Sequence, residues 1–143
     1  MRIARELLDE ILAHARADAP DECCGLVAAR DGRATRVFRA ENTEHSPLRF
    51  NIDGREILRT VEEIEAAGEE LGAIYHSHTR SAPHPSQTDV QFALVDGRGD
   101  QWWPGTLYLI VGVAGAEPEL RLWDIRPGGG VEEVPLEVDE GGE

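Results

Sequence analysis

The chain has 143 residues, of which 29% are charged and 41% hydrophobic, so we expect one globular domain with a sizeable core. The formal net charge of -14 argues against nucleic acid and anionic membranes as partners, because phosphate-rich ligands attract basic surfaces. No apolar run approaches the roughly 20 residues of a bilayer-spanning helix, and charges interrupt any N-terminal signal sequence, so we expect a cytoplasmic protein.

The first forty residues predict a helix followed by a hairpin. Apolar residues at helical spacing predict a helix over residues 3–18, and Pro20 lies beyond its end. Residues 25–30 predict a strand, and the Asp31-Gly32 pair is typical of a two-residue hairpin turn. We therefore expect the returning strand at residues 35–38.

Two adjacent cysteines, Cys23 and Cys24, precede the first predicted strand and are the chain's complete set. Neighbouring cysteines rarely satisfy the geometry of an ordinary disulfide, which agrees with a reducing compartment. We interpret them as small side chains at the start of a strand rather than as a redox pair, with a cysteine nucleophile as the open alternative.

The middle of the chain predicts two further helices around a buried strand. Residues 49–52 predict a short strand, and Asp53 can cap a helix over residues 54–67. The apolar run at residues 72–78 predicts a buried strand, and residues 86–95 predict a short helix.

The last third predicts strands only, at residues 106–113, 120–125 and 131–138. The whole pattern predicts an α/β (α+β) fold, a mixed sheet flanked by helices, in a single domain over residues 1–138. We expect residues 139–143 to form an acidic, flexible tail.

Three of the five histidines lie between residues 76 and 90. His76 and His78 are two residues apart on a predicted strand, so both side chains leave the same face. Asp89 follows eleven residues after His78 and could close a three-ligand site. Two imidazoles, one carboxylate and an open position are typical of a catalytic zinc.

A structural interpretation of the same residues stays open at this point. Ser86 and Asp89 have the spacing of a helix capping box, with Asp in place of Glu. The two interpretations are compatible, because Ser86 could begin the helix while its hydroxyl faces the metal. We expect the third histidine, His84, to be an exposed loop residue or at most a substrate contact.

The arrangement resembles the signature of the JAMM (MPN+) metalloproteases. That signature is His-Ser-His, seven residues, Ser, two residues, Asp, and this chain matches every spacing at residues 76–89. Glu22, in the segment PDECCGLV, stands where the family has its glutamate, and NTEHSPLRF at residues 42–50 is similar to the family's Asn…Ser-Pro…aromatic segment. The resemblance extends to Val113. Thr79 departs from it, because many eukaryotic members have proline there.

The resemblance implies a JAMM/MPN-like (cytidine-deaminase-like) fold and a zinc ion, Zn2+, held by His76, His78 and Asp89. It also implies that Glu22 is the general base that activates water and then protonates the leaving amine. Ser86 would stabilise the oxyanion of the tetrahedral intermediate. For Ser77, between the two histidines, we expect a structural role on the opposite face.

The substrate implied for a small bacterial member without insertions is a ubiquitin-like sulfur-carrier protein. The enzyme would hydrolyse the peptide bond after its C-terminal Gly-Gly and release a cysteine. We expect the carrier's tail to add to a strand edge at residues 49–52. Three alternatives remain: an isopeptidase that removes ubiquitin-like modifiers from lysines, a non-catalytic MPN scaffold, and a plain metal-binding module.

Trp102 and Trp103 lie in a predicted loop. They could be core side chains, or an exposed patch for a partner or for a second copy in a homodimer. We expect core packing for one of them.

Overall fold

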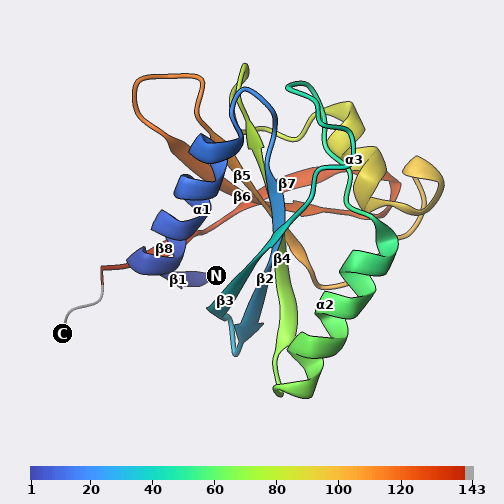
Figure 1. Ribbon diagram of the computed structural model, residues 1–143. Helices are drawn as coiled ribbons and strands as arrows, with labels where there is room; N and C mark the ends of the chain where they lie inside the picture. Colours follow the sequence, from blue (N-terminus) through green and yellow to red (C-terminus); the bar gives the residue numbers. More distant parts are fainter. Residues whose placement is uncertain (141–143) are drawn as a thin grey trace.

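The fold of the computed structural model, which describes residues 1–140, is an eight-stranded mixed sheet with three α-helices packed on it (Figure 1). The helices are α1 (Arg5–Asp18), α2 (Gly54–Ala66) and α3 (Gln87–Ala93). The strands are β1 (Arg2–Ala4), β2 (Cys24–Arg30), β3 (Arg33–Ala40), β4 (Glu70–His78), β5 (Leu107–Gly112), β6 (Glu119–Ile125), β7 (Val131–Val134) and β8 (Glu137–Asp139). Single turns of 3-10 helix follow α3 and β6, at Val95–Gly97 and Pro127–Gly129.

The strand order β7-β6-β5-β4-β2-β3-β1-β8 puts β4 in the interior of the sheet, antiparallel to β2 and parallel to β5. All seven residues from Gly72 to His78 are buried, which agrees with a strand covered on both faces. The carboxyl end of β4 is therefore a fixed frame for the two histidines that it carries.

Two apolar clusters lie on opposite faces of this sheet. One cluster packs α1 against alternate strand residues, among them Val27, Tyr75 and Val111. The other packs α2 and α3 against the intervening residues, among them Ile74 and Ile110. The predicted mixed sheet flanked by helices is thus confirmed, and residues of β4 alternate between the two clusters.

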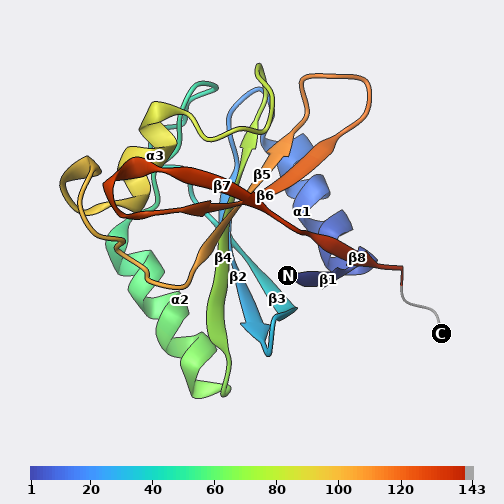
Figure 2. The ribbon, with the colours of Figure 1, turned by 180° about the vertical axis from the view of Figure 1, so that it is seen from behind.

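The two edge strands of the sheet, β7 and β8, follow each other directly in the chain (Figure 2). The single strand predicted over residues 131–138 is wrong, because Pro135 separates β7 from β8, which lie at opposite ends of the strand order. β8 pairs with β1 in parallel, with Ile3 opposite Val138.

The pairing with β8 also corrects the start of the first helix. Ile3 is fully buried in a strand rather than in the predicted helix, which begins at Arg5. The same pairing includes Asp139, and Arg5 forms a 2.9 Å ion pair with Glu140. Residues 141–143 of the expected flexible tail lie outside the described residues, so flexibility there stays a prediction.

The strand predicted over residues 49–52 is absent from the described chain, where this segment is a loop. The backbone of Asn51 is already hydrogen-bonded: its N–H donates to the Asn42 side chain at 3.2 Å, and its carbonyl accepts from Thr43 N–H at 2.9 Å. Phe50 and Ile52 are buried against the core. The predicted strand at residues 49–52 is therefore wrong, and the docking of a substrate tail at this segment stays a prediction.

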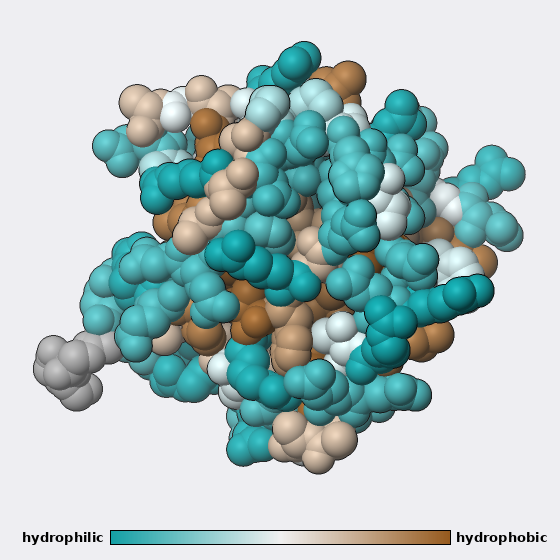
Figure 3. All heavy atoms as spheres, in the orientation of Figure 1, coloured by the Kyte–Doolittle hydropathy of each residue, from teal (hydrophilic) through white to brown (hydrophobic). Residues whose placement is uncertain are grey.

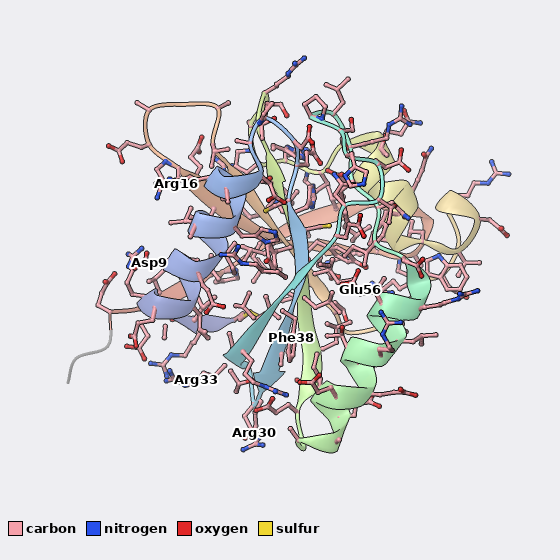
Figure 4. The ribbon with its side chains drawn as sticks, viewed as in Figure 1. Asp9, Arg16, Arg30, Arg33, Phe38 and Glu56 are labelled. Carbon is pink, nitrogen blue, oxygen red and sulfur yellow. The ribbon has the colours of Figure 1, made fainter. Side chains whose placement is uncertain are left out.

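Hydrophilic residues cover most of the face in Figure 3, as the composition requires. Arg30 and Arg33 flank the β2–β3 turn, at the opposite end of the sheet from the carboxyl end of β4 (Figure 4). No helix within residues 1–140 combines the length and the apolar run that a bilayer crossing requires.

Candidate metal centre

His76 and His78 converge at the carboxyl end of β4, as their spacing predicted. Their Nε2 atoms are 3.1 Å apart, and both side chains are buried. The Phe50 ring stacks on the His76 ring, with centroids 4.3 Å apart and an interplanar angle of 19°. Nδ1 of His78 lies 2.7 Å from the Ala82 carbonyl, which can only accept, so Nδ1 carries the proton.

Asp89 reaches the same point from the first turn of α3. Its Oδ2 atom lies 3.1 Å from Nε2 of His76 and 3.0 Å from Nε2 of His78. The capping box is also present, because Ser86 N–H donates to Oδ2 of Asp89 at 2.9 Å and Asp89 N–H donates to Oγ of Ser86 at 3.1 Å. The cap and the three-residue cluster therefore coexist, and the cap fixes the Asp89 rotamer.

The geometry of the three atoms fits a small cation. In a tetrahedral zinc site with bonds of about 2.0–2.1 Å, ligand atoms stand roughly 3.3 Å apart. The three separations here are 3.0–3.1 Å. Since the Ala82 carbonyl holds the proton of neutral His78 on Nδ1, a lone pair on Nε2 faces the carboxylate. A cation or a shared proton must lie between these atoms, and nitrogen and carboxylate donors suit Zn2+.

The electrostatics of the cluster agree with this fit. Burial would raise the pKa of Asp89, but His76, His78 and the Ser86 N–H hold it well below its ordinary value. Burial lowers the pKa of His76, and Asp89 opposes this only in part. Burial would also lower the pKa of His78, yet its contacts with Asp89 and Ala82 raise it overall. The site thus holds an ionised carboxylate beside a His76 imidazole whose neutral form burial favours, and a neutral ring nitrogen is the form that binds a cation.

Glu22 lies beside this cluster. Cys24 pairs with His76 across β2 and β4, and continuing that register by two residues places Glu22 next to His78. The side chain is 4% exposed, and its Oε1 atom has no hydrogen-bond partner among residues 1–140. Burial raises the pKa of Glu22 to about 8, with His78 opposing the shift and Asp89 adding to it.

The backbone of Glu22 is held by the loop that follows β3. Its N–H donates to the Ser46 carbonyl at 2.9 Å, and its carbonyl accepts from Nδ2 of Asn42 at 3.0 Å. Asn42 is buried and makes further bonds to the backbone of Glu44, Arg49 and Asn51. Asn42 and Phe50 were not predicted as site residues; their segment's resemblance to the family was the signal that could have identified them.

Ser86 and Ser77 take up different positions. Oγ of Ser86 accepts from Asp89 N–H, which leaves its own proton free to donate outward from an exposed position. Ser77 is fully buried, and its Oγ accepts from Cys23 N–H at 2.8 Å. The expected structural role of Ser77 agrees with this contact.

The remaining side chains singled out from the sequence lie outside the cluster. Cys23 and Cys24 are free and buried, and burial raises the pKa of both thiols, that of Cys23 to about 11, which disfavours a thiolate nucleophile.

His84 is exposed, and its ring contacts the Trp123 ring edge-on. Trp103 packs on the core while Trp102 is 56% exposed, which confirms core packing for one of the pair.

A pocket of about 300 Å³ opens beside Glu22 and is strongly acidic. Its lining consists of Asp18, Asp21, Glu22, Glu41, Asn42 and His45. Any group that occupies this space faces several carboxylates in addition to Glu22. Cationic groups are therefore favoured there over anionic ones.

Comparison with known proteins places these residues in one family. A family model described as prokaryotic homologs of the JAB domain matches residues 4–126. The chain is 36% identical over 141 residues to the CysO-cysteine peptidase of Mycobacterium tuberculosis, covering 96% of this chain and 90% of that protein. It is also 36% identical over 117 residues to the Desampylase of Haloferax volcanii, covering 77% of this chain and 78% of that protein.

A solved structure shares the fold of this chain over nearly its whole length. The solution structure of protein DSY2949 from Desulfitobacterium hafniense aligns with a TM-score of 0.80 and 30% identity, over 99% of this chain and 94% of that one. The similarity spans all the residues of the cluster described above.

Proposed function

Because the chain belongs to the prokaryotic JAB-domain family, the JAMM (MPN+) metallopeptidases, we propose that it is a zinc peptidase acting on the C-terminal tail of a ubiquitin-like sulfur-carrier protein. It hydrolyses the peptide bond after the carrier's terminal Gly-Gly and releases cysteine. The observation that carries this proposal is the convergence of His76, His78 and Asp89 next to the buried Glu22, whose Oε1 atom has no hydrogen-bond partner within residues 1–140. The full-length similarity to a CysO-cysteine peptidase supports the substrate.

His76, His78 and Asp89 would hold the zinc ion. When bound there, zinc supplies Lewis acidity toward the scissile carbonyl and lowers the pKa of water toward about 7. The Ala82 carbonyl and the Ser86 N–H keep the His78 tautomer and the Asp89 rotamer in the ligating form.

Glu22 acts as the proton carrier of the reaction. Its carboxylate takes the proton of the attacking water and then delivers it to the leaving amine. The burial that raises its pKa to about 8 makes the carboxylate a stronger base than an exposed glutamate. Bound zinc opposes this rise, because a nearby cation favours the ionised form.

Ser86 would supply a hydrogen-bond donor to the carbonyl oxygen of the scissile bond. Its Oγ is anchored by Asp89 N–H, so the hydroxyl proton is free to donate to the developing oxyanion. This division of work needs no additional nucleophile, which agrees with the buried, protonated thiols of Cys23 and Cys24.

A second activity, removal of ubiquitin-like modifiers from lysines, is favoured by two observations. The chain is similar to a Desampylase, and the pocket beside Glu22 is acidic. Both substrates release an amine, but a leaving cysteine also carries a free carboxylate, which those carboxylates repel, whereas a leaving lysine side chain carries none. A noncatalytic scaffold or plain metal-binding module predicts hydrolysis of neither substrate.

Product masses separate these activities. The zinc-loaded protein is incubated with a carrier that ends in Gly-Gly-Cys, and separately with the same carrier joined through Gly-Gly to a lysine ε-amine. We expect loss of cysteine from the first substrate at a higher kcat/KM than cleavage of the second. The reverse order assigns the chain as an isopeptidase, and no cleavage of either overturns the proposal.

A further inference from the structure

The segment that carries Glu22 is hydrogen-bonded to the end of β4 on both sides of that residue. On one side, Cys23 exchanges two hydrogen bonds with Ser77: Ser77 N–H donates to the Cys23 carbonyl at 3.1 Å, and Cys23 N–H donates to Oγ of Ser77 at 2.8 Å. The first of these continues the β2–β4 ladder. In the second, a side-chain hydroxyl takes the place of a backbone acceptor where the strand pair ends.

On the other side of Glu22, Thr79 makes the hydrogen bond. Its Oγ1 donates to the Pro20 carbonyl at 2.9 Å and stands 3.4 Å from the Pro47 carbonyl. Thr79 therefore ties the turn after α1 to β4, close to the loop that supplies the Ser46 carbonyl to Glu22 N–H.

Ser77 and Thr79 are the two neighbours of His78, while Pro20 and Cys23 bracket Glu22. Side chains alternate along β4, so His78 faces the metal cluster while Ser77 faces the α1 side of the sheet. The proposed base and one proposed ligand are thus both held by three consecutive residues at the end of β4, of which Thr79 lies just beyond the strand. A displacement of about 1 Å between reacting groups can reduce a rate by ~100-fold, so this shared frame has a chemical consequence.

We propose that Ser77 and Thr79 are positioning residues for Glu22: their hydroxyls fix the backbone on either side of the base and hold its carboxyl beside His78. Neither hydroxyl touches the reacting atoms. The inference rests on the proposed function, because it takes Glu22 as the general base.

Thr79→Val tests the inference with the smaller risk to folding, because Thr79 is half-buried whereas Ser77 is fully buried. The substitution removes the donor and keeps the side-chain shape. We expect kcat on the preferred carrier substrate to fall about 10-fold to 100-fold, with KM and zinc content unchanged. Thr79→Ser, which keeps the hydroxyl, restores most of the rate.

A control is offered by a similar hydrogen bond to the other end of β4, donated by Thr106 just before β5. Thr106 is buried, and its Oγ1 donates to the Leu71 carbonyl of β4 at 3.1 Å. Thr106→Val removes the same type of bond far along β4 from His78 and should lower thermal stability without changing kcat. Equal losses of kcat in Thr79→Val and Thr106→Val would make the effect a general consequence of weakening β4 and would overturn the inference.

Combination with Glu22→Gln separates this inference from the proposed function. If Thr79 acts through Glu22, Thr79→Val lowers kcat in the native background and adds nothing in the Gln background. Full activity of Glu22→Gln would overturn the proposed function itself. An inactive Glu22→Gln beside a fully active Thr79→Val would overturn only the role of Thr79.

Discussion

Two histidine-centred clusters lie on opposite faces of β4, and they differ in how completely their polar atoms are paired. On the α1 face, Nδ1 of His14 lies 2.6 Å from the Tyr75 hydroxyl and Nε2 lies 3.3 Å from Asp18. Both ring nitrogens therefore have a partner. On the other face, within residues 1–140, Nδ1 of His76 and Oε1 of Glu22 have none.

This difference in pairing indicates that the His14 cluster stabilises the fold and that the His76 cluster is reactive. A paired buried histidine contributes to stability and offers no lone pair to a ligand. Converging lone pairs and an unpaired carboxyl oxygen cost free energy in the folded protein, and such costs are concentrated where a protein binds a ligand or performs chemistry. The two clusters therefore predict opposite responses to substitution.

The largest expected effect is that of His78→Ala. It removes one of three converging donors, so we expect zinc content near zero and no detectable turnover, while the fold is retained. Zinc analysis by mass spectrometry and circular dichroism measure the two outcomes. His84→Ala is the control, because this exposed loop histidine should leave both zinc and turnover unchanged. A zinc-replete His78→Ala protein would remove His78 from the ligand set.

Ser86→Ala should have the next largest effect, a fall in kcat of about 100-fold to 1,000-fold with zinc retained. The same change removes the cap of α3 and should cost about 1 kcal/mol of unfolding free energy. Kinetics and urea unfolding measure the two losses separately. Ser86→Thr keeps the hydroxyl and should recover most of both. A kcat unchanged by Ser86→Ala would leave the residue as a cap alone.

Tyr75→Phe should affect stability and spare chemistry, because it acts on the paired cluster. It leaves Nδ1 of His14 buried without its 2.6 Å partner, at an expected cost of about 1–2 kcal/mol in unfolding free energy. Urea unfolding gives that cost, and kcat should stay within twofold. A large loss of kcat at full zinc occupancy would contradict the division between the two faces.

The smallest expected effect is a gain in the free energy of unfolding of the metal-free protein when Glu22 is replaced by Gln. The folded state raises the pKa of Glu22 from 4.5 to about 8, so the folded protein holds this proton more tightly than the unfolded chain. That stabilisation is complete below pH 4.5 and is lost as the pH rises toward 8. With solvent screening, Glu22→Gln should therefore be about 1–2 kcal/mol more stable than the native chain at pH 8 and nearly equal at pH 4. Urea unfolding in chelator at both pH values tests the difference.

The site was more predictable than the strands around it. His-x-His on a buried strand and Ser-x-x-Asp at a helix start impose their own geometry, and the structure has the convergence and the cap that these spacings predicted. Glu22 could be identified only through the family resemblance, because a single acidic residue before a strand has no local pattern that marks it as catalytic. Its place beside His78 comes from the register of β2 on β4.

The missed elements depend on pairing between distant segments. β1 and β8 are three residues each and form a parallel pair across more than 130 residues of chain, which periodicity in a short window cannot detect. Residues 49–52 alternate like a strand, but the buried amide of Asn42 holds them as a loop. Thr79 gave no sign of its contact with Pro20, since only the folded turn brings that carbonyl near.

Turnover by zinc-loaded Glu22→Gln tests most directly whether this cluster is a peptidase centre with Glu22 as its base. The variant keeps all three proposed ligands and loses only the proton carrier. We expect native zinc content and a kcat about 100-fold to 10,000-fold below that of the native protein on the preferred carrier substrate. A native kcat in the zinc-loaded Gln variant would contradict that role of Glu22.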